Sequence, residues 1–229
     1  MEYLGSNLAR EINRLTGWSG PVFQGRYSMI VVTEEEEAKI ERFKYLLAQG
    51  CKENLVARLR DWPGIHSVGA LVDGEPLTGH WIDRTREYSA RRRGRTSDGR
   101  RFATEETLVL APLPCWRHLA SDVYRCRVAE LVEAIERDAA AERALTRIKP
   151  LGRSAISAQD PHHRPAMVAR SPAPLVHAAS QVARLAFREV YDAFVTAFRD
   201  AAEKLRRGDP SARFQPGSFP PGMPFVSVR

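Results

Sequence analysis

The chain has 229 residues, 43% of them apolar and 28% charged, which is typical of a globular protein and excludes a disordered one. No apolar stretch approaches the roughly 20 residues that a membrane-spanning helix needs, and no signal peptide opens the chain, so no membrane partner is expected. Three widely spaced cysteines argue against a disulfide framework and favour a cytoplasmic location. The net charge of +7 favours polyanionic partners such as nucleic acid.

The N-terminal part predicts helices on either side of a short strand. Leucine and isoleucine side chains at helical spacing indicate an amphipathic first helix that ends near Thr16. The β-branched run 28–32 predicts a strand. Consecutive glutamates, which the helix dipole favours in a first turn, begin a predicted helix from Glu34 to about Gln49. A further helix is predicted over 52–59.

The remainder predicts helices separated by basic or proline-rich segments. The arginine tract 84–101 has no clear apolar period, so no helix or strand is predicted there, and 107–113 is predicted as a strand. Apolar stripes predict long helices over 121–145 and 175–207, with a short one over 152–158. The fold class expected from these elements is a helix-dominated α+β protein.

Tyr45 has an unusual place on the helix predicted from Glu34. Ile40, Phe43 and Leu47 form its apolar stripe, and Tyr45 lies about 200° around the helix from Phe43. The phenol is therefore expected to project from the polar side. A tyrosine there is free to meet a substrate, but periodicity alone favours the simpler interpretation that its ring covers a neighbouring element.

The stretch 20–63 resembles the REP-associated tyrosine transposases, part of the single-tyrosine HUH transposase superfamily. The similar pieces, in order and at the family's spacing, are Phe23-Gln24-Gly25-Arg26-Tyr27, Tyr45-Leu46-Leu47-Ala48-Gln49, Leu55-Val56 and Asp61-Trp62-Pro63. The region after Gly64 resembles the long C-terminal extension of a subgroup of these transposases.

The resemblance implies DNA transposition, the cleavage and rejoining of single-stranded or hairpin DNA of a mobile element through a 5′-phosphotyrosine intermediate. It makes Tyr45 the catalytic nucleophile and Gln49, one helical turn later, a ligand for Mg²⁺ or Mn²⁺. The simpler interpretation of Gln49 is a solvated residue at a helix end. The superfamily's His-hydrophobic-His motif occurs nowhere in the chain, which begins only about 40 residues before Tyr45.

The implied fold is the C-terminal remnant of a ferredoxin-like HUH domain joined to a helical extension. The expected domains are residues 1–66 from the catalytic domain, a basic connecting region over 67–118, and a helical extension over 119–229. Because the histidine pair is absent, the chain alone is expected to be inactive. The expected protein partners are a second copy, as a homodimer, or a separately encoded HUH half.

Arginines provide the expected contacts with DNA, since guanidinium groups bind phosphate in a bidentate way. The alternatives are a surface ion pair for the first of them and a solvated loop for the arginine tract. The predicted DNA-binding residues are Arg26, Arg91, Arg92, Arg93 and Arg95. Two other functions remain open at this point: a non-catalytic hairpin DNA-binding protein and a non-functional gene remnant.

Overall fold

The computed structural model describes residues 2–23, 29–94, 99–163, 174–209 and 211–221. This part of the chain is a helix-dominated α+β protein, with 57% helix and two small sheets, which confirms the expected class. No helix among these residues is long and apolar enough to cross a membrane.

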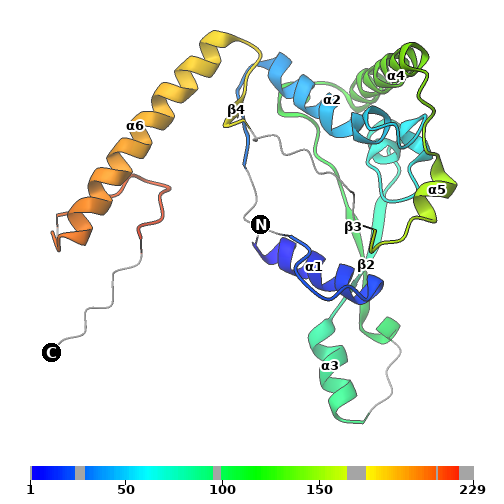
Figure 1. The fold of residues 1–229 in the computed structure, drawn as a ribbon, viewed down its shortest axis with the longest axis horizontal. Helices are drawn as coiled ribbons and strands as arrows, with labels where there is room; N and C mark the ends of the chain where they lie inside the picture. The colour runs from blue at the N-terminus through cyan, green and yellow to red at the C-terminus, as the bar shows by residue number, and fades with distance from the viewer. Residues whose placement is uncertain (1, 24–28, 95–98, 164–173, 210, 222–229) are drawn as a thin grey trace. The chain divides into compact units, whose positions relative to one another are not determined.

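The main elements can be followed in chain order in Figure 1. They are α1 (Glu2–Thr16), β1 (Val31–Val32), α2 (Glu36–Lys52), β2 (Leu77–Ile82), α3 (Arg84–Arg92), β3 (Ala103–Leu108), α4 (Ser121–Thr146), α5 (Arg153–Ser157), β4 (Val176–His177) and α6 (Gln181–Arg206). Short 3₁₀ turns lie at Leu59–Asp61, Gly99–Phe102 and Pro114–Trp116, and a π-helical turn at Gly69–Asp73.

The chain divides into two compact units. The first contains Met1–Gly25 and Ile40–Val168, and the second contains Arg26–Lys39 and Ala169–Arg229, so the boundary falls within α2. In the second unit, β1 and β4 form a two-stranded parallel sheet. The Glu35 carboxylate accepts hydrogen bonds from the backbone N–H groups of Ala179 and Ser180, which fixes the residues that precede α6.

The core of the first unit lies where α2 and α4 pack together. Leu47 and Cys51 of α2 are buried there with Val128 and Ile135 of α4, and they leave at most 3% of their surface exposed. Each of these residues recurs at helical spacing on one face of its helix, so burial of that face holds both helices in place. The expected apolar stripes of α2 and α4 are thereby confirmed.

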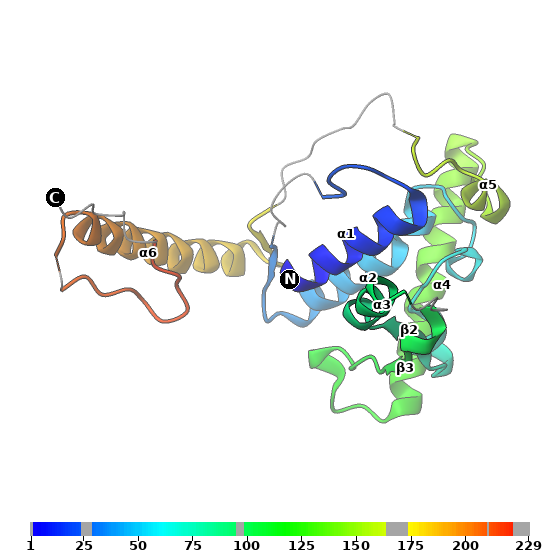
Figure 2. The same cartoon turned by 90° about the horizontal axis from the view of Figure 1, so that it is seen from below.

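An antiparallel ribbon of two strands carries α3 at its end, as Figure 1 shows. The register of β2 and β3 runs from Leu77 opposite Leu108 to Ile82 opposite Ala103. In both views, α1 lies next to the N-terminal end of α3 (Figures 1 and 2).

Several expected elements differ from the structure. The strand expected over 107–113 is instead β3 at Ala103–Leu108, and the helix expected from 175 begins at Gln181, after β4. In the tract 84–101, for which no helix was predicted, α3 forms over the first part without an apolar stripe. The Asp83 carboxylate caps this helix by accepting the Arg86 backbone N–H, and ion pairs within the helix add to its stability. The helix expected over 52–59 is also absent: α2 continues through Gly50 to Lys52, and the chain then turns at Asn54 with a φ of 54°.

Candidate nucleic-acid interface

Tyr45 lies on the outer side of α2, with 41% of its surface exposed. Leu47, two residues later, is buried in the core with 3% exposed. Side chains two positions apart on a helix point about 200° away from each other. Burial of Leu47 therefore turns the Tyr45 phenol outward. The predicted orientation of Tyr45 is confirmed.

Two cationic side chains flank the Tyr45 ring. The guanidinium carbon of Arg42 lies 4.5 Å from the ring centroid, and Nζ of Lys52 lies 5.0 Å from it. Such distances allow a cation–π attraction, which holds both long side chains beside the ring. An anionic group that approached the Tyr45 hydroxyl would therefore meet two positive charges, each able to donate hydrogen bonds to phosphate oxygens.

Tyr45 and Gln49 line the same surface cleft, which has a volume of about 500 Å³. The residues that line it are Tyr45, Leu46, Gln49, Gly50, Lys52, Glu53, Leu55, Trp62, Ile65 and His66. The volume is within the range of small-molecule sites and suits one nucleotide unit better than a duplex. The cleft thus brings together the two residues on which the sequence interpretation of the catalytic helix depends.

His66 also lines this cleft, which the sequence did not indicate. Its Nδ1 accepts a hydrogen bond of 3.2 Å from the Val68 backbone N–H, and its ring also forms a hydrogen bond with the Leu47 backbone. Burial lowers the pKa of the imidazole below its usual value, so the ring is neutral at pH 7. Since Nδ1 is bonded to the Val68 backbone, the His66 ring is held in the wall of the cleft.

The donors of this cleft do not by themselves fit a Mg²⁺ or Mn²⁺ site. Among the residues that the structure describes, no group of three or more His, Cys, Asp or Glu side chains could hold a metal ion. Gln49 offers one amide oxygen and Glu53 one carboxylate, whereas Mg²⁺ takes six ligands. The expected role of Gln49 as a ligand therefore requires donors beyond those found around it.

The predicted DNA-binding arginines lie outside the cleft or outside the described residues. Arg26 and Arg95 lie outside the described residues. Arg91 forms an ion pair with Glu87, although 65% of its side chain remains exposed. Arg92 and Arg93 are exposed at the C-terminal end of α3. Of the predicted residues that the structure describes, Arg92 and Arg93 are therefore the ones that lie outside this ion pair.

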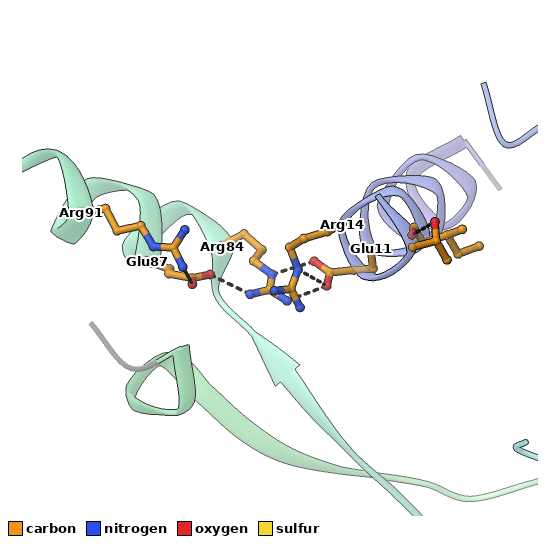
Figure 3. A network of polar contacts seen from close by, with 7 residues as sticks. Glu11, Arg14, Arg84, Glu87 and Arg91 are labelled. Carbon is orange, nitrogen blue, oxygen red and sulfur yellow. Dashed lines mark hydrogen bonds and ion pairs between the residues drawn. The ribbon is translucent and has the colours of Figure 1, made fainter. Parts of the chain in front are cut away.

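A network of ion pairs joins α1 to α3 (Figure 3). Arg84 donates from Nε and Nη2 to the two carboxylate oxygens of Glu11, at 2.6 and 2.5 Å. Its Nη1 donates to Glu87 at 2.7 Å, and Arg91 donates to the other oxygen of Glu87 at 2.8 Å. These hydrogen bonds, first of all those from Arg84, lower the pKa values of both carboxyl groups.

Glu87 is the buried centre of this network. Only 6% of its surface is exposed, and among the residues that the structure describes it is the only charged one that is buried. A carboxylate removed from water needs partners of opposite charge, and the two arginines supply them. The arginines of α3 therefore fall into two groups, those that hold the helix in place and those that remain available to an external anion.

Comparisons of the chain with family models, with curated proteins and with solved structures gave no match. Its function is therefore inferred from its own side chains. The features that bear on it are the cleft beside Tyr45 and the basic end of α3.

Proposed function

We propose that this protein is a transposase-related DNA-binding protein, which holds single-stranded or hairpin DNA with one phosphodiester against Tyr45. The proposal includes the interpretation of its N-terminal part as the remnant of a ferredoxin-like HUH domain. The observation that carries it is the cleft in which an outward phenol, Gln49 and Lys52 line one hollow, with Arg42 over the same ring.

The chemistry available to Tyr45 is nucleophilic substitution at phosphorus. The phenolic oxygen forms a bond to phosphorus, and the bond from phosphorus to the 3′ oxygen of the preceding nucleotide breaks. The phenol gives its proton to solvent, the departing oxygen takes one to become a 3′-hydroxyl, and the DNA stays attached as a 5′-phosphotyrosine. Attack by the 3′-hydroxyl on the phosphotyrosine reverses these steps and rejoins the strand.

Arg42 and Lys52 have a direct part in this scheme. A phosphodiester under attack accumulates negative charge on its non-bridging oxygens, and preorganised cations stabilise that charge. The two side chains already lie beside the Tyr45 ring before any DNA arrives. They therefore bind the phosphate and orient it toward the phenolic oxygen.

The family's metal ion would polarise the same phosphoryl oxygens. Since the donors around Gln49 do not fit a Mg²⁺ or Mn²⁺ site by themselves, the remaining ligands are proposed to come from another chain. A second copy of this protein and a separately encoded HUH half are the two candidates. The same shortage of donors supports a second function, hairpin DNA binding without cleavage, in which Tyr45 contacts the phosphate but does not attack it.

Binding of a fluorescent DNA hairpin, measured by anisotropy at several salt concentrations, tests the proposal. In the variant Arg42→Gln/Lys52→Gln, we expect weaker binding and a salt dependence whose log–log slope is smaller by about 1–2 units, because each phosphate contact contributes about 0.7–0.9. The matched control is Arg137→Gln/Arg188→Gln, which removes the same charge from exposed residues outside the cleft. Equal slopes for the two variants, or no binding by the unchanged protein, would refute the proposal.

A further inference from the structure

The exposed side of α3 combines an aromatic ring with cations. Tyr88 has 62% of its surface exposed, far more than a ring that packs in a core. The guanidinium carbon of Arg92 lies 6.0 Å from the centroid of the Tyr88 ring. Arg93, the next residue, is also exposed and caps the helix through its backbone. An aromatic face beside cations is the arrangement that binds a nucleotide by stacking and charge together.

Another side of the helix is anchored, which gives this surface a fixed position. Glu87 is turned inward and held by Arg84 and Arg91, and Arg84 in turn is held by Glu11 of α1 (Figure 3). Consecutive residues on a helix point about 100° apart, so Tyr88 lies on a different side of α3 from the inward Glu87, and its ring is exposed. The ion pairs hold α3 in place, and the ring is left free of them.

The ribbon that carries α3 also keeps this surface accessible. Most residues of β2 and β3 are exposed, and only Leu77, Ile82 and Ala103 are partly buried. A two-stranded ribbon of this kind is narrow enough to approach the grooves of a nucleic acid. The helix at its end is therefore presented to a large partner without interference from the core.

We infer that Tyr88 stacks on an unpaired base of a DNA hairpin loop, while Arg92 and Arg93 bind the adjoining phosphates. The inference rests on the proposed function, because it takes DNA as the partner. It adds a second contact site, which prefers unpaired nucleotides. Bases inside a duplex are already stacked on each other, so a tyrosine ring on the surface of a helix reaches only a base that is splayed out.

The test compares two labelled DNAs with the same stem, one closed by a loop of unpaired nucleotides and one a blunt duplex. For Tyr88→Ala we expect hairpin binding to weaken about 5- to 150-fold, the range for loss of one stacked base, and duplex binding to change by less than about twofold. Tyr88→Phe retains the ring and should bind the hairpin as the unchanged protein does. Tyr3→Ala, at a tyrosine with 73% of its surface exposed on α1, is the matched control.

Circular dichroism of each variant shows whether α3 and the rest of the fold persist, which the exposure of Tyr88 leads us to expect. If Tyr88→Ala binds the hairpin as tightly as Tyr3→Ala does, or loses duplex binding to the same extent, the inference is wrong while DNA binding itself stands. If the unchanged protein binds neither DNA, the proposed function fails first and the inference fails with it.

Discussion

Removal of the Arg84 side chain should loosen α1 and α3 together. Arg84 donates three hydrogen bonds to carboxylates, two to Glu11 of α1 and one to Glu87 of its own helix. Arg84→Ala abolishes all three. It leaves the buried carboxylate of Glu87 with Arg91 as its partner in the network.

The exposure of the partners sets the magnitude. The side chains of Arg84 and Glu11 are 30% and 37% exposed, so each contact between them is screened by water and contributes about 0.2–1 kcal/mol. The Glu87 side chain is 7% exposed, which makes the loss of one of its two donors more costly. The three contacts together stabilise the attachment of the two helices by about 1–2 kcal/mol. That free energy corresponds to about a 5- to 30-fold change in the equilibrium between attached and opened helices.

Hydrogen exchange of backbone amides measures this opening directly. In Arg84→Ala, amides of α1 and α3 should exchange about 5- to 30-fold faster, while those of α4 should keep their rates because its buried face is untouched. Arg84→Lys keeps the charge but loses the bidentate geometry, so an intermediate rate is expected. Unchanged exchange in α1 and α3, or an equal acceleration in α4, would refute the reasoning.

Three further outcomes are expected. Hydrogen bonds from Arg84 lower the pKa of the Glu87 carboxyl below its ordinary value of 4.5. The stability that this carboxylate adds is therefore complete above pH 4.5 and is lost as the pH falls through the lower pKa of the folded state. At such low pH, the thermal midpoint of the unchanged protein should approach that of Arg84→Ala. Gly74→Ala should cost about 1–3 kcal/mol in urea unfolding, since Gly74 has a φ of +74°, at which a residue with a Cβ is strained, and the Arg125 guanidinium must also move from the added Cβ. Leu59→Ala should cost about 2–5 kcal/mol in the same assay, because Leu59 is 1% exposed; a cost as small as that of a surface substitution would contradict the described core.

The parts of the fold that the sequence predicted are those with a regular apolar period. Leu47 in α2 and Val128 and Ile135 in α4 recur at helical spacing, and each is buried in the structure. Their helices were predicted because apolar residues at helical spacing in the local sequence indicate which face of a helix is buried. The same argument placed Tyr45 on the outer side of α2, where it lies.

Features that depend on distant residues were missed. The helix α3 has no apolar stripe, and one of its stabilising partners is Glu11, separated from Arg84 by 73 positions in the chain. The helix α2 was expected to end at about Gln49, but it continues through Gly50, where a Cβ would lie 3.1 Å from the Val56 side chain. The place of His66 in the cleft depends on the chain path after Trp62, for which the sequence carries no periodic signal.

A hairpin oligonucleotide whose scissile 3′ oxygen is replaced by sulfur tests the central claim most directly. A thiolate is a far better leaving group than an alkoxide, so attack by Tyr45 should proceed even where the donors for a metal ion are incomplete. The account predicts release of a free thiol together with a DNA adduct on the peptide that contains Tyr45, detected by mass spectrometry and lost in Tyr45→Phe. Thiol release without an adduct at Tyr45, or no reaction with a hairpin that the protein binds, would contradict the role of Tyr45 as the nucleophile.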